Sequence, residues 1–374
     1  MLAAKWRLTV VQLLPALNAG GVERSTVEIA QALVAQGHRA IVISGEGRLV
    51  ASLNACGAEH ICLPIGRKAV STIRWILPLR RIFKQLRPDI VHARSRLPAW
   101  IGRFVLFSLS QSQRPRWITT VHGLYSRSFY SAVMMSGERV ICVSETVRKK
   151  MMKDYPTIQA NRLRVIPRGI DLAYFASSPR RDSHARAWAS QLLSGWDRQS
   201  SLLILPGRGT RLKGHQDALM LIASLQRQGI NAFLWLVGVR EPARLAYVQQ
   251  LEDCAKTLGV AHAVAMSPVI DQMNQVYAAS DIVLQLSRRP EAFGRTVLEA
   301  LSVQRPVVGW DHGGVGELLH RFLPEGAVQP FDHTALSERV CRLLDCPLDV
   351  PRPSSLTLQA MQVSTLNVYA ELCH

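Results

Sequence analysis

The sequence of 374 residues has few acidic residues, no CxxC cysteine pair and no long apolar run. Its 27 Asp and Glu face 45 Lys and Arg, which gives a net charge of +18. Seven cysteines without a CxxC pair argue against a disulfide framework or a zinc site and predict reduced, buried thiols. The longest strongly apolar stretch, Leu97–Leu109, carries Arg103 and is too short to cross a bilayer.

The start of the chain also lacks the pattern of a secretory signal. No basic region followed by an apolar core and a cleavage site is present, and the apolar run Leu8–Leu14 is typical of a buried strand. We therefore expect a cytoplasmic protein. Hydrophobic residues make up 48% and charged residues 19% of the chain, which excludes a disordered protein and suits about two globular domains.

The positive charge is concentrated in one half of the chain. Residues 1–174 carry a net charge of +17, whereas residues 175–374 carry +1. Such asymmetry predicts a polyanionic partner for the first half alone, either nucleic acid, an anionic membrane surface or a phosphorylated substrate. No nucleic-acid-binding signature is present, so we expect no nucleic acid partner.

A basic segment at 67–87 contributes seven of these cations, interleaved with Trp75, Leu79 and Phe83. Cations beside bulky apolar side chains suit an anionic membrane surface, and the cluster 148–153 would extend the patch. The alternative is a core helix with a solvated basic face, although Pro78 argues against one straight helix.

Short β-rich runs alternate with amphipathic segments along the whole chain. The expected strands are 8–14, 40–44, 60–63, 90–92, 117–121, 139–143, 202–205, 232–237, 263–266, 282–286 and 306–310. Alternation of this kind predicts an α/β protein with parallel doubly wound sheets, here two Rossmann-like domains facing a central cleft. We expect an N-terminal domain over 1–175, a polar linker over 176–199 and a C-terminal domain over 200–357.

Three glycine-rich segments follow expected strands and precede helices. They are Asn18–Arg24, Pro206–His215 and Trp310–Glu317. Glycines allow close backbone approach to an anion, and a helix N-terminus adds free N–H groups, while Arg208 and Lys213 suit a pyrophosphate. None matches GxGxxG or the P-loop, so plain turns and a solvated basic loop are the alternatives.

Acidic and histidine side chains complete the candidates. Glu291 and Glu299 are eight positions apart, a spacing that suits either hydrogen bonds to sugar hydroxyls, a hydrolase pair or an ordinary acidic helix surface. His122 closes the strand 117–121, where a ligand-binding role and a structural role are both open.

In this order the motifs resemble the retaining, nucleotide-sugar-dependent glycosyltransferases of family 4, which have the GT-B fold. The resemblance covers nearly the whole chain. Within the family, the sequence is most similar to members assigned to lipopolysaccharide or other cell-envelope glycan assembly. It rests on the following segments: Gly20–Arg24, Val91–Arg96, Val121–Gly123, Val143–Ser144, Ile166–Asp171, Gly207–Arg208, Lys213–Gly214, Glu291 with Glu299, and Gly313–Gly314 with Glu317.

The resemblance implies a role for each candidate residue. Arg208 and Lys213 would bind the donor diphosphate, and Glu291 would hold hydroxyls of the transferred sugar. His122 would contact the sugar near its anomeric centre, and Glu299 would bind the ribose. The remaining donor-binding positions would be Gly20, Gly21, Val269, Ala292, Phe293 and Gly294. A helix at about 358–374 would cross back onto the first domain.

The resemblance also implies the chemistry and the partners. No side chain is a clear nucleophile, so the leaving phosphate would take the acceptor proton in a front-face transfer, with no metal and no other cofactor. The expected donor is a UDP- or GDP-sugar, and the expected acceptor an anionic glycolipid at the inner membrane face. The alternatives are a soluble acceptor, as in sucrose synthases, and a non-catalytic nucleotide-sugar-binding protein.

Two positions depart from the family pattern. Arg168 stands where many members have Asn, and Arg211 is an additional cation in the segment between Arg208 and Lys213. The sequence leaves the roles of both open.

Overall fold

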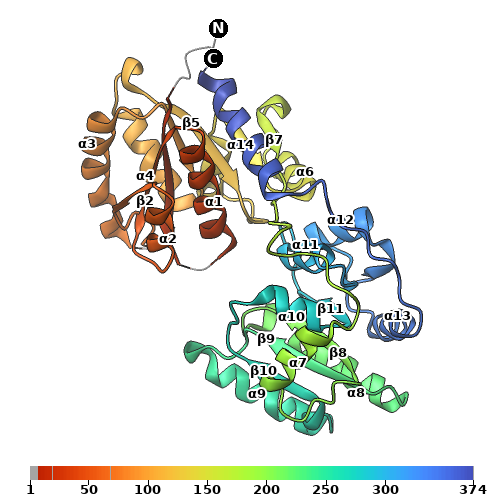
Figure 1. Cartoon of the computed structure of the whole chain (residues 1–374). Helices are drawn as coiled ribbons and strands as arrows, with labels where there is room; N and C mark the ends of the chain where they lie inside the picture. Colours follow the sequence, from red (N-terminus) through yellow and green to blue (C-terminus); the bar gives the residue numbers. More distant parts are fainter. Residues whose placement is uncertain (1–6, 19, 68, 374) are drawn as a thin grey trace. The chain divides into compact units, whose positions relative to one another are not determined.

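Two compact units make up the chain (Figure 1). The computed structural model describes residues 7–18, 20–67 and 69–373. The first unit comprises Met1–Gly169 and Leu358–His374, and the second Ile170–Thr357. The first six residues of the expected first domain, Lys68 of the basic segment and His374 of the expected last helix lie outside the described residues.

The first unit contains a sheet of seven parallel strands in the order β3-β2-β1-β4-β5-β6-β7. Its strands are β1 Thr9–Ala16, β2 Arg39–Gly45, β3 Glu59–Cys62, β4 Ile90–Ala93, β5 Arg116–Val121, β6 Arg139–Cys142 and β7 Leu163–Val165. The central strands are apolar over consecutive residues, because helices cover both faces of a parallel sheet. Val10 and Val11 of β1 are accordingly both fully buried.

The helices of the first unit include one from the far end of the chain. They are α1 Gly21–Ala35, α2 Val50–Ala55, α3 Ile76–Leu86, α4 Arg96–Phe107, α5 Phe129–Ala132, α6 Glu145–Asp154 and α14 Leu358–Cys373, with short 3-10 helices η1 Val70–Trp75, η2 Gln111–Gln113, η3 Val133–Met135 and η4 Ala160–Arg162. Helix α14 contributes Met361, Leu366 and Tyr369 to the same core as α1 and β1.

The basic segment forms η1 and α3, and Pro78 lies in the first turn of α3. Proline is tolerated there because the first N–H groups of a helix have no intrahelical acceptor. Leu79 and Phe83 are buried, whereas Ile73 and Leu77 are exposed. The segment therefore combines a core-facing stripe with an outer face that carries both cations and apolar side chains.

The second unit contains six parallel strands in the order β10-β9-β8-β11-β12-β13. Its strands are β8 Ser201–Pro206, β9 Ala232–Val237, β10 Val264–Ser267, β11 Ile282–Gln285, β12 Val307–Trp310 and β13 Ala327–Val328. Its helices are α7 Ser183–Leu192, α8 His215–Arg227, α9 Leu245–Thr257, α10 Met273–Ala279, α11 Arg295–Ser302, α12 Gly313–Phe322 and α13 His333–Asp345, with 3-10 helices η5 Arg211–Lys213, η6 Pro242–Arg244, η7 Ala261–Ala263 and η8 Pro324–Gly326. The prediction of an α/β protein with two Rossmann-like domains is confirmed.

The units divide after Gly169, which is earlier than the expected end of the first domain at 175. Within the expected linker 176–199, helix α7 is part of the second unit. Its Arg186 donates to Asp281 at 2.9 Å and to the backbone oxygen of Ser200 at 2.7 Å. Asp281 also accepts from the Leu202 N–H at 2.8 Å, so a buried ion pair joins α7 to the start of β8.

The cysteines differ in part from the expectation. All seven are free, but only Cys142 is buried, while Cys62 and Cys346 are exposed. Among the described residues, no helix is both long enough and apolar enough to cross a membrane.

Candidate functional site

The predicted site residues gather at the carboxyl edges of the two sheets. The strand order reverses between β1 and β4 in the first unit and between β8 and β11 in the second. Open parallel sheets bind ligands beyond the carboxyl ends of their strands at such a reversal. In the first unit Gly20 and His122 follow β1 and β5, and in the second Arg208 and Glu291 follow β8 and β11.

In the second unit Lys213 and Glu291 are in direct contact, although 78 positions separate them. The Lys213 Nζ donates to Glu291 Oε1 at 2.6 Å, and both side chains are about a quarter exposed. Ser287, which follows β11, donates its hydroxyl to the same carboxylate oxygen. A partly exposed ammonium is thereby held beside a fixed carboxylate. In this arrangement the ammonium can bind a phosphate while the carboxylate accepts a hydrogen bond from a sugar hydroxyl.

Glycine makes the approach of Lys213 to β11 possible. Gly214 has a φ of +76°, and a Cβ there would lie 2.0 Å from the backbone oxygen of Leu286. Any side chain would therefore separate the loop of Lys213 from the end of β11. On the other side, a Cβ on Gly207 would lie 3.2 Å from the Lys213 side chain, so the chain folds closely around this lysine.

The loop that carries Glu291, Ala292, Phe293 and Gly294 rests on the first turn of α12. The Gly314 N–H donates to the Glu291 carbonyl at 2.7 Å. A Cβ on Gly314 would lie 2.4 Å from the Phe293 Cα, so only glycine fits there. Gly294, the residue before α11, has a φ of +97°, so the loop bends sharply where the helix begins.

Glu299 lies within α11 and is nearly buried. Its Oε2 accepts from the Tyr277 hydroxyl at 2.8 Å, and its Oε1 lies 3.4 Å from Arg295 Nε. The two glutamates thus have different neighbours. Glu299 contacts Tyr277 of α10, and Glu291 contacts Lys213. The sequence did not identify Tyr277 or Ser287 as partners, because each is brought to its carboxylate only by the fold.

Val269 lies near the backbone of the Arg208 loop, and Arg211 belongs to that loop. Val269 is 57% exposed, and its Cγ2 is 3.9 Å from the point where a Cβ on Gly238 would stand, next to the backbone of Gly207. Arg211 donates to Gln250 Oε1 of α9 at 3.0 Å. Arg208 itself is exposed on the loop after β8.

In the first unit the predicted glycines begin α1. Gly20 is the extended residue before the helix, and its carbonyl accepts from the Arg24 N–H at 2.9 Å. A Cβ on Gly20 would meet the Glu23 carboxylate at 2.4 Å, whereas a Cβ on Gly21 would meet nothing within 4 Å.

His122 is in contact with Arg168, the residue that departs from the family pattern. An Arg168 Nη2 donates to His122 Nδ1, and Nη1 donates to Ser25 Oγ at 2.9 Å. Because a guanidinium has only donors, Nδ1 must accept, and the proton of a neutral ring then lies on Nε2. Nε2 is buried and has no hydrogen-bond partner among the described residues.

The electrostatics keep the His122 ring neutral. Burial, followed by the charges of Arg168 and Arg94 and by His92, lowers the pKa of His122 well below its usual value. His122 therefore presents an N–H donor rather than a cation or a base. Such a donor suits a ligand oxygen.

A buried polar network lies beside His122, and only the motif Val91–Arg96 pointed to it in the sequence. Arg94 is 2% exposed and donates to Gln12 Oε1 at 2.8 Å and to Ser25 Oγ. Burial lowers the pKa of Arg94 to about 10. His92 contacts Tyr369 Oη at 2.7 Å and Thr120 Oγ1 at 2.6 Å, so α14 is tied to β4 and β5.

Two family models match this chain. "Glycosyltransferase Family 4" matches residues 19–174, and "Glycosyl transferases group 1" matches residues 194–360. A curated relative, D-inositol 3-phosphate glycosyltransferase of Kineococcus radiotolerans, is 27% identical over 52% of this chain. The match spans 44% of that relative, so less than half of its length is compared.

Solved structures share the fold across nearly the whole chain. A glycosyltransferase from Rickettsia africae superimposes with a TM-score of 0.85 at 24% identity and covers 98% of both chains. Anabaena HepE in complex with UDP-glucose superimposes with a TM-score of 0.75 at 18% identity, covering 98% of each chain. At these identities the likeness is one of fold.

Proposed function

Because this chain belongs to the group 1 glycosyltransferases with the GT-B fold, we propose that it transfers a hexose-type sugar from a nucleotide sugar with retention of configuration. The acceptor in this proposal is a lipid-linked or lipopolysaccharide-core glycan at the cytoplasmic face of the membrane. The observation that carries the donor side is the contact of Lys213 with Glu291 at the carboxyl edge of the second sheet. HepE, which has the same fold, binds UDP-glucose.

The proposed reaction uses the residues as follows. Lys213 and Arg208 stabilise the charge that develops on the departing diphosphate, while Glu291 accepts hydrogen bonds from the sugar hydroxyls. The bond from the anomeric carbon to the phosphate oxygen breaks, and the acceptor oxygen bonds to that carbon on the same face. The acceptor proton passes to the leaving phosphate oxygen. No divalent ion takes part in this scheme, since cations of the protein supply the charge.

The acceptor side of the proposal rests on charge. Residues 1–174 carry +17, so the first unit suits an anionic acceptor and an anionic membrane surface. The name of the Kineococcus relative includes a phosphorylated inositol. The experiment must therefore distinguish a soluble phosphorylated acceptor from a lipid-linked one.

The donor is tested with UDP-, GDP- and ADP-sugars, first by their effect on the melting temperature and then in transfer assays. Lys213→Ala and Arg208→Ala should each lower kcat/KM by a factor that corresponds to about 2–4 kcal/mol, because each removes a charge from the transition state. Arg211→Ala is the matched control, since Arg211 donates to Gln250 and should leave turnover near that of the unchanged protein.

The contrary outcomes are specific. Unchanged turnover in both variants would exclude the assigned roles, and stabilisation by a nucleotide without any turnover would indicate a binding protein. Loss of activity with EDTA that magnesium restores would contradict the metal-independent scheme. NMR of the product decides whether configuration is retained, and lipid-linked and soluble acceptors compared side by side decide the acceptor.

A further inference from the structure

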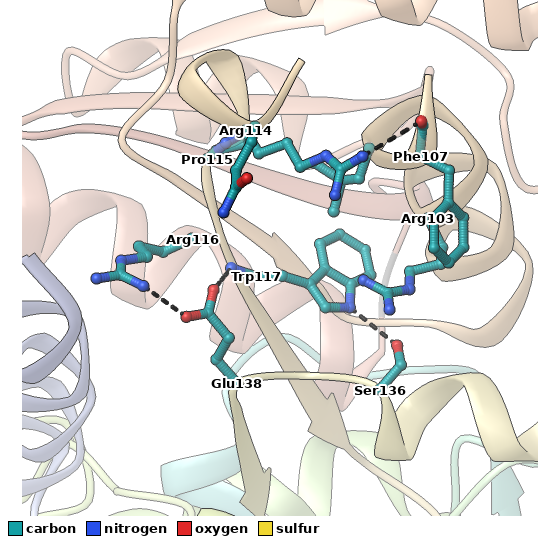
Figure 2. A pocket seen from close by; sticks show the side chains of 10 residues that line it. Arg103, Phe107, Arg114, Pro115, Arg116, Trp117, Ser136 and Glu138 are labelled. Atoms are coloured by element: carbon teal, nitrogen blue, oxygen red, sulfur yellow. Dashed lines mark hydrogen bonds and ion pairs between the residues drawn. The ribbon is translucent and has the colours of Figure 1, made fainter. Parts of the chain in front are cut away.

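A pocket opens at the amino-terminal edge of the first sheet, opposite the edge that carries His122. It has a volume of about 480 Å³ and lies between the end of α4, η2, the first residues of β5 and the loop before β6 (Figure 2). Strand β5 separates the pocket from His122, and six residues of strand span about 20 Å. The pocket is therefore separate from His122 in the first unit.

Arginine dominates the lining of the pocket. Arg103, Arg114 and Arg116 share it with one carboxylate, that of Glu138. This carboxylate is already engaged, because it accepts from Arg116 Nη1 at 2.8 Å and from the Trp117 backbone N–H at 2.9 Å (Figure 2). The lining thus has an excess of positive charge that no side chain of the pocket balances.

Arg103 and Arg114 carry this excess. The Arg103 guanidinium lies 4.5 Å from the centre of the Phe107 ring, and no hydrogen bond or ion pair joins it to any other residue that the structure describes. Burial, together with the nearby charges of Arg114 and Arg162, lowers the pKa of Arg103. Arg114 donates to backbone oxygens of Leu109 at 3.0 Å and Phe107 at 3.4 Å, so it too lacks a carboxylate partner among the described residues.

An exposed aromatic row leads along α4 to the pocket. It consists of Phe129, Trp100, Phe104 and Phe107, and the last three lie on one face of the helix. The ring centres of Trp100 lie 5.1 Å from Phe129 and 5.7 Å from Phe104. Phe129 is 82%, Phe107 61% and Phe104 48% exposed. Such a group of exposed phenylalanines is unusual on a protein surface that contacts only water.

Helix α3, the neighbour of α4, carries further cations. It packs against α4, and Arg80 donates to the Ser108 backbone oxygen at 3.3 Å. Arg81 and Lys84 are exposed on the same helix. Aromatic side chains flanked by arginine and lysine are the composition of a surface that binds the headgroup region of a bilayer.

We infer that the aromatic row docks on an anionic bilayer and that the pocket binds the phosphate of a phospholipid headgroup between Arg103 and Arg114. Guanidinium groups bind phosphate oxygens through paired, charge-assisted hydrogen bonds, and a phosphate would balance the excess charge. The inference deepens the proposed membrane location, on which it rests, by naming the surface and the lipid group.

Co-sedimentation with vesicles of phosphatidylglycerol in phosphatidylcholine tests the inference. An exposed cation near an anionic surface contributes about fivefold to binding, so Arg81→Gln measures the general loss of one charge. Arg103→Gln should weaken binding clearly more than this, by tenfold or more, because it also removes the phosphate partner. Phe107→Ser should weaken binding to the same vesicles through loss of the inserted ring.

A second arm separates a lipid headgroup from a free phosphate. Glycerol 1-phosphate should compete with the vesicles for the unchanged protein. Equal losses of vesicle binding in Arg103→Gln and Arg81→Gln would refute phosphate binding in the pocket. Binding of glycerol phosphate without binding of vesicles would refute docking on a bilayer. Unchanged melting temperatures control for folding of each variant.

The test is independent of transferase activity. Transfer to a soluble acceptor analogue should be the same with and without Arg103, because the pocket lies at the edge of the first sheet opposite His122 and Arg103 has no role in the proposed transfer. A protein that binds vesicles through Arg103 but transfers no sugar would refute the proposed function and leave the docking surface standing.

Discussion

At the scale of single residues, Arg168 determines how His122 can act. The family pattern usually places Asn at this position, and an amide could either donate to or accept from an imidazole nitrogen. Arginine removes that choice, since it only donates, and so fixes the ring proton on Nε2. An arginine at position 168 therefore sets the tautomer of His122, a residue 46 positions away in the sequence.

We expect Arg168→Asn to release this constraint. The Nδ1 and Nε2 forms of His122 should then both be populated, and the His122 pKa should rise because one of the charges that lower it is gone. Nitrogen-15 NMR of histidine-labelled protein measures both quantities directly. Arg127→Asn, which changes an exposed arginine between the end of β5 and α5, is the control, and an unchanged tautomer in Arg168→Asn would refute the assignment.

At the scale of elements, the order of strands and helices could be predicted from the sequence, but two short strands could not. The eleven predicted strands all occur, whereas β7 with three residues and β13 with two are too short to show a period. Helix α7 was also missed, since the segment 176–199 is rich in Ser, Arg and Asp and so suggests a linker, although its Arg186 is buried in the fold.

The contact between α12 and the Glu291 loop leads to a prediction. Gly314→Ala should lower the free energy of unfolding by about 1–3 kcal/mol and also lower turnover, because the new methyl group would displace Phe293 and with it Glu291. Gly229→Ala is the matched control. Its φ of +74° costs about 1 kcal/mol, but nothing lies within 4 Å of its Cβ.

Urea unfolding and steady-state kinetics distinguish the two variants. Gly229→Ala should keep full turnover, since it only strains the end of α8. Equal stability and equal turnover of both variants would show that the loop adapts to a side chain at 314.

At the scale of the whole molecule, the candidate residues fall into two sets, one at the carboxyl edge of each sheet. The position of the glycine turns, Arg208, Lys213 and the two glutamates at these edges could be predicted from the sequence, because each follows an expected strand or lies in the helix after it. Their partners could not, since Lys213 meets Glu291 and His122 meets Arg168 only through the order of strands in the sheet. The buried contacts of Arg94 with Gln12 and of Tyr369 with His92 could not be predicted for the same reason.

Helix α14 is an integral part of the first unit, and its removal gives a further prediction. Its buried hydrophobic side chains are Met361, Leu366, Val368, Tyr369 and Leu372. Burial of each stabilises by about 1.5–3 kcal/mol, so their sum approaches the whole stability of a typical domain.

A chain that ends at Thr357 should therefore lose the folded first unit and keep the second. Hydrogen exchange should show unprotected amides in β1 and β4 and protected amides in β8 and β9. Tyr369→Ala is the milder variant and should cost about 3–5 kcal/mol in the first unit. Protection of β1 and β4 in the shortened chain would contradict this account.

The placement of α14 also has a consequence for synthesis on the ribosome. The second unit is one uninterrupted stretch, Ile170–Thr357, and can fold as soon as it has emerged. The first unit is begun earlier but lacks α14 until translation has passed residue 357. At about 5–20 residues per second, its apolar core waits about 10–40 s for that helix. During this interval the nascent first unit is the part of the protein that needs protection by chaperones.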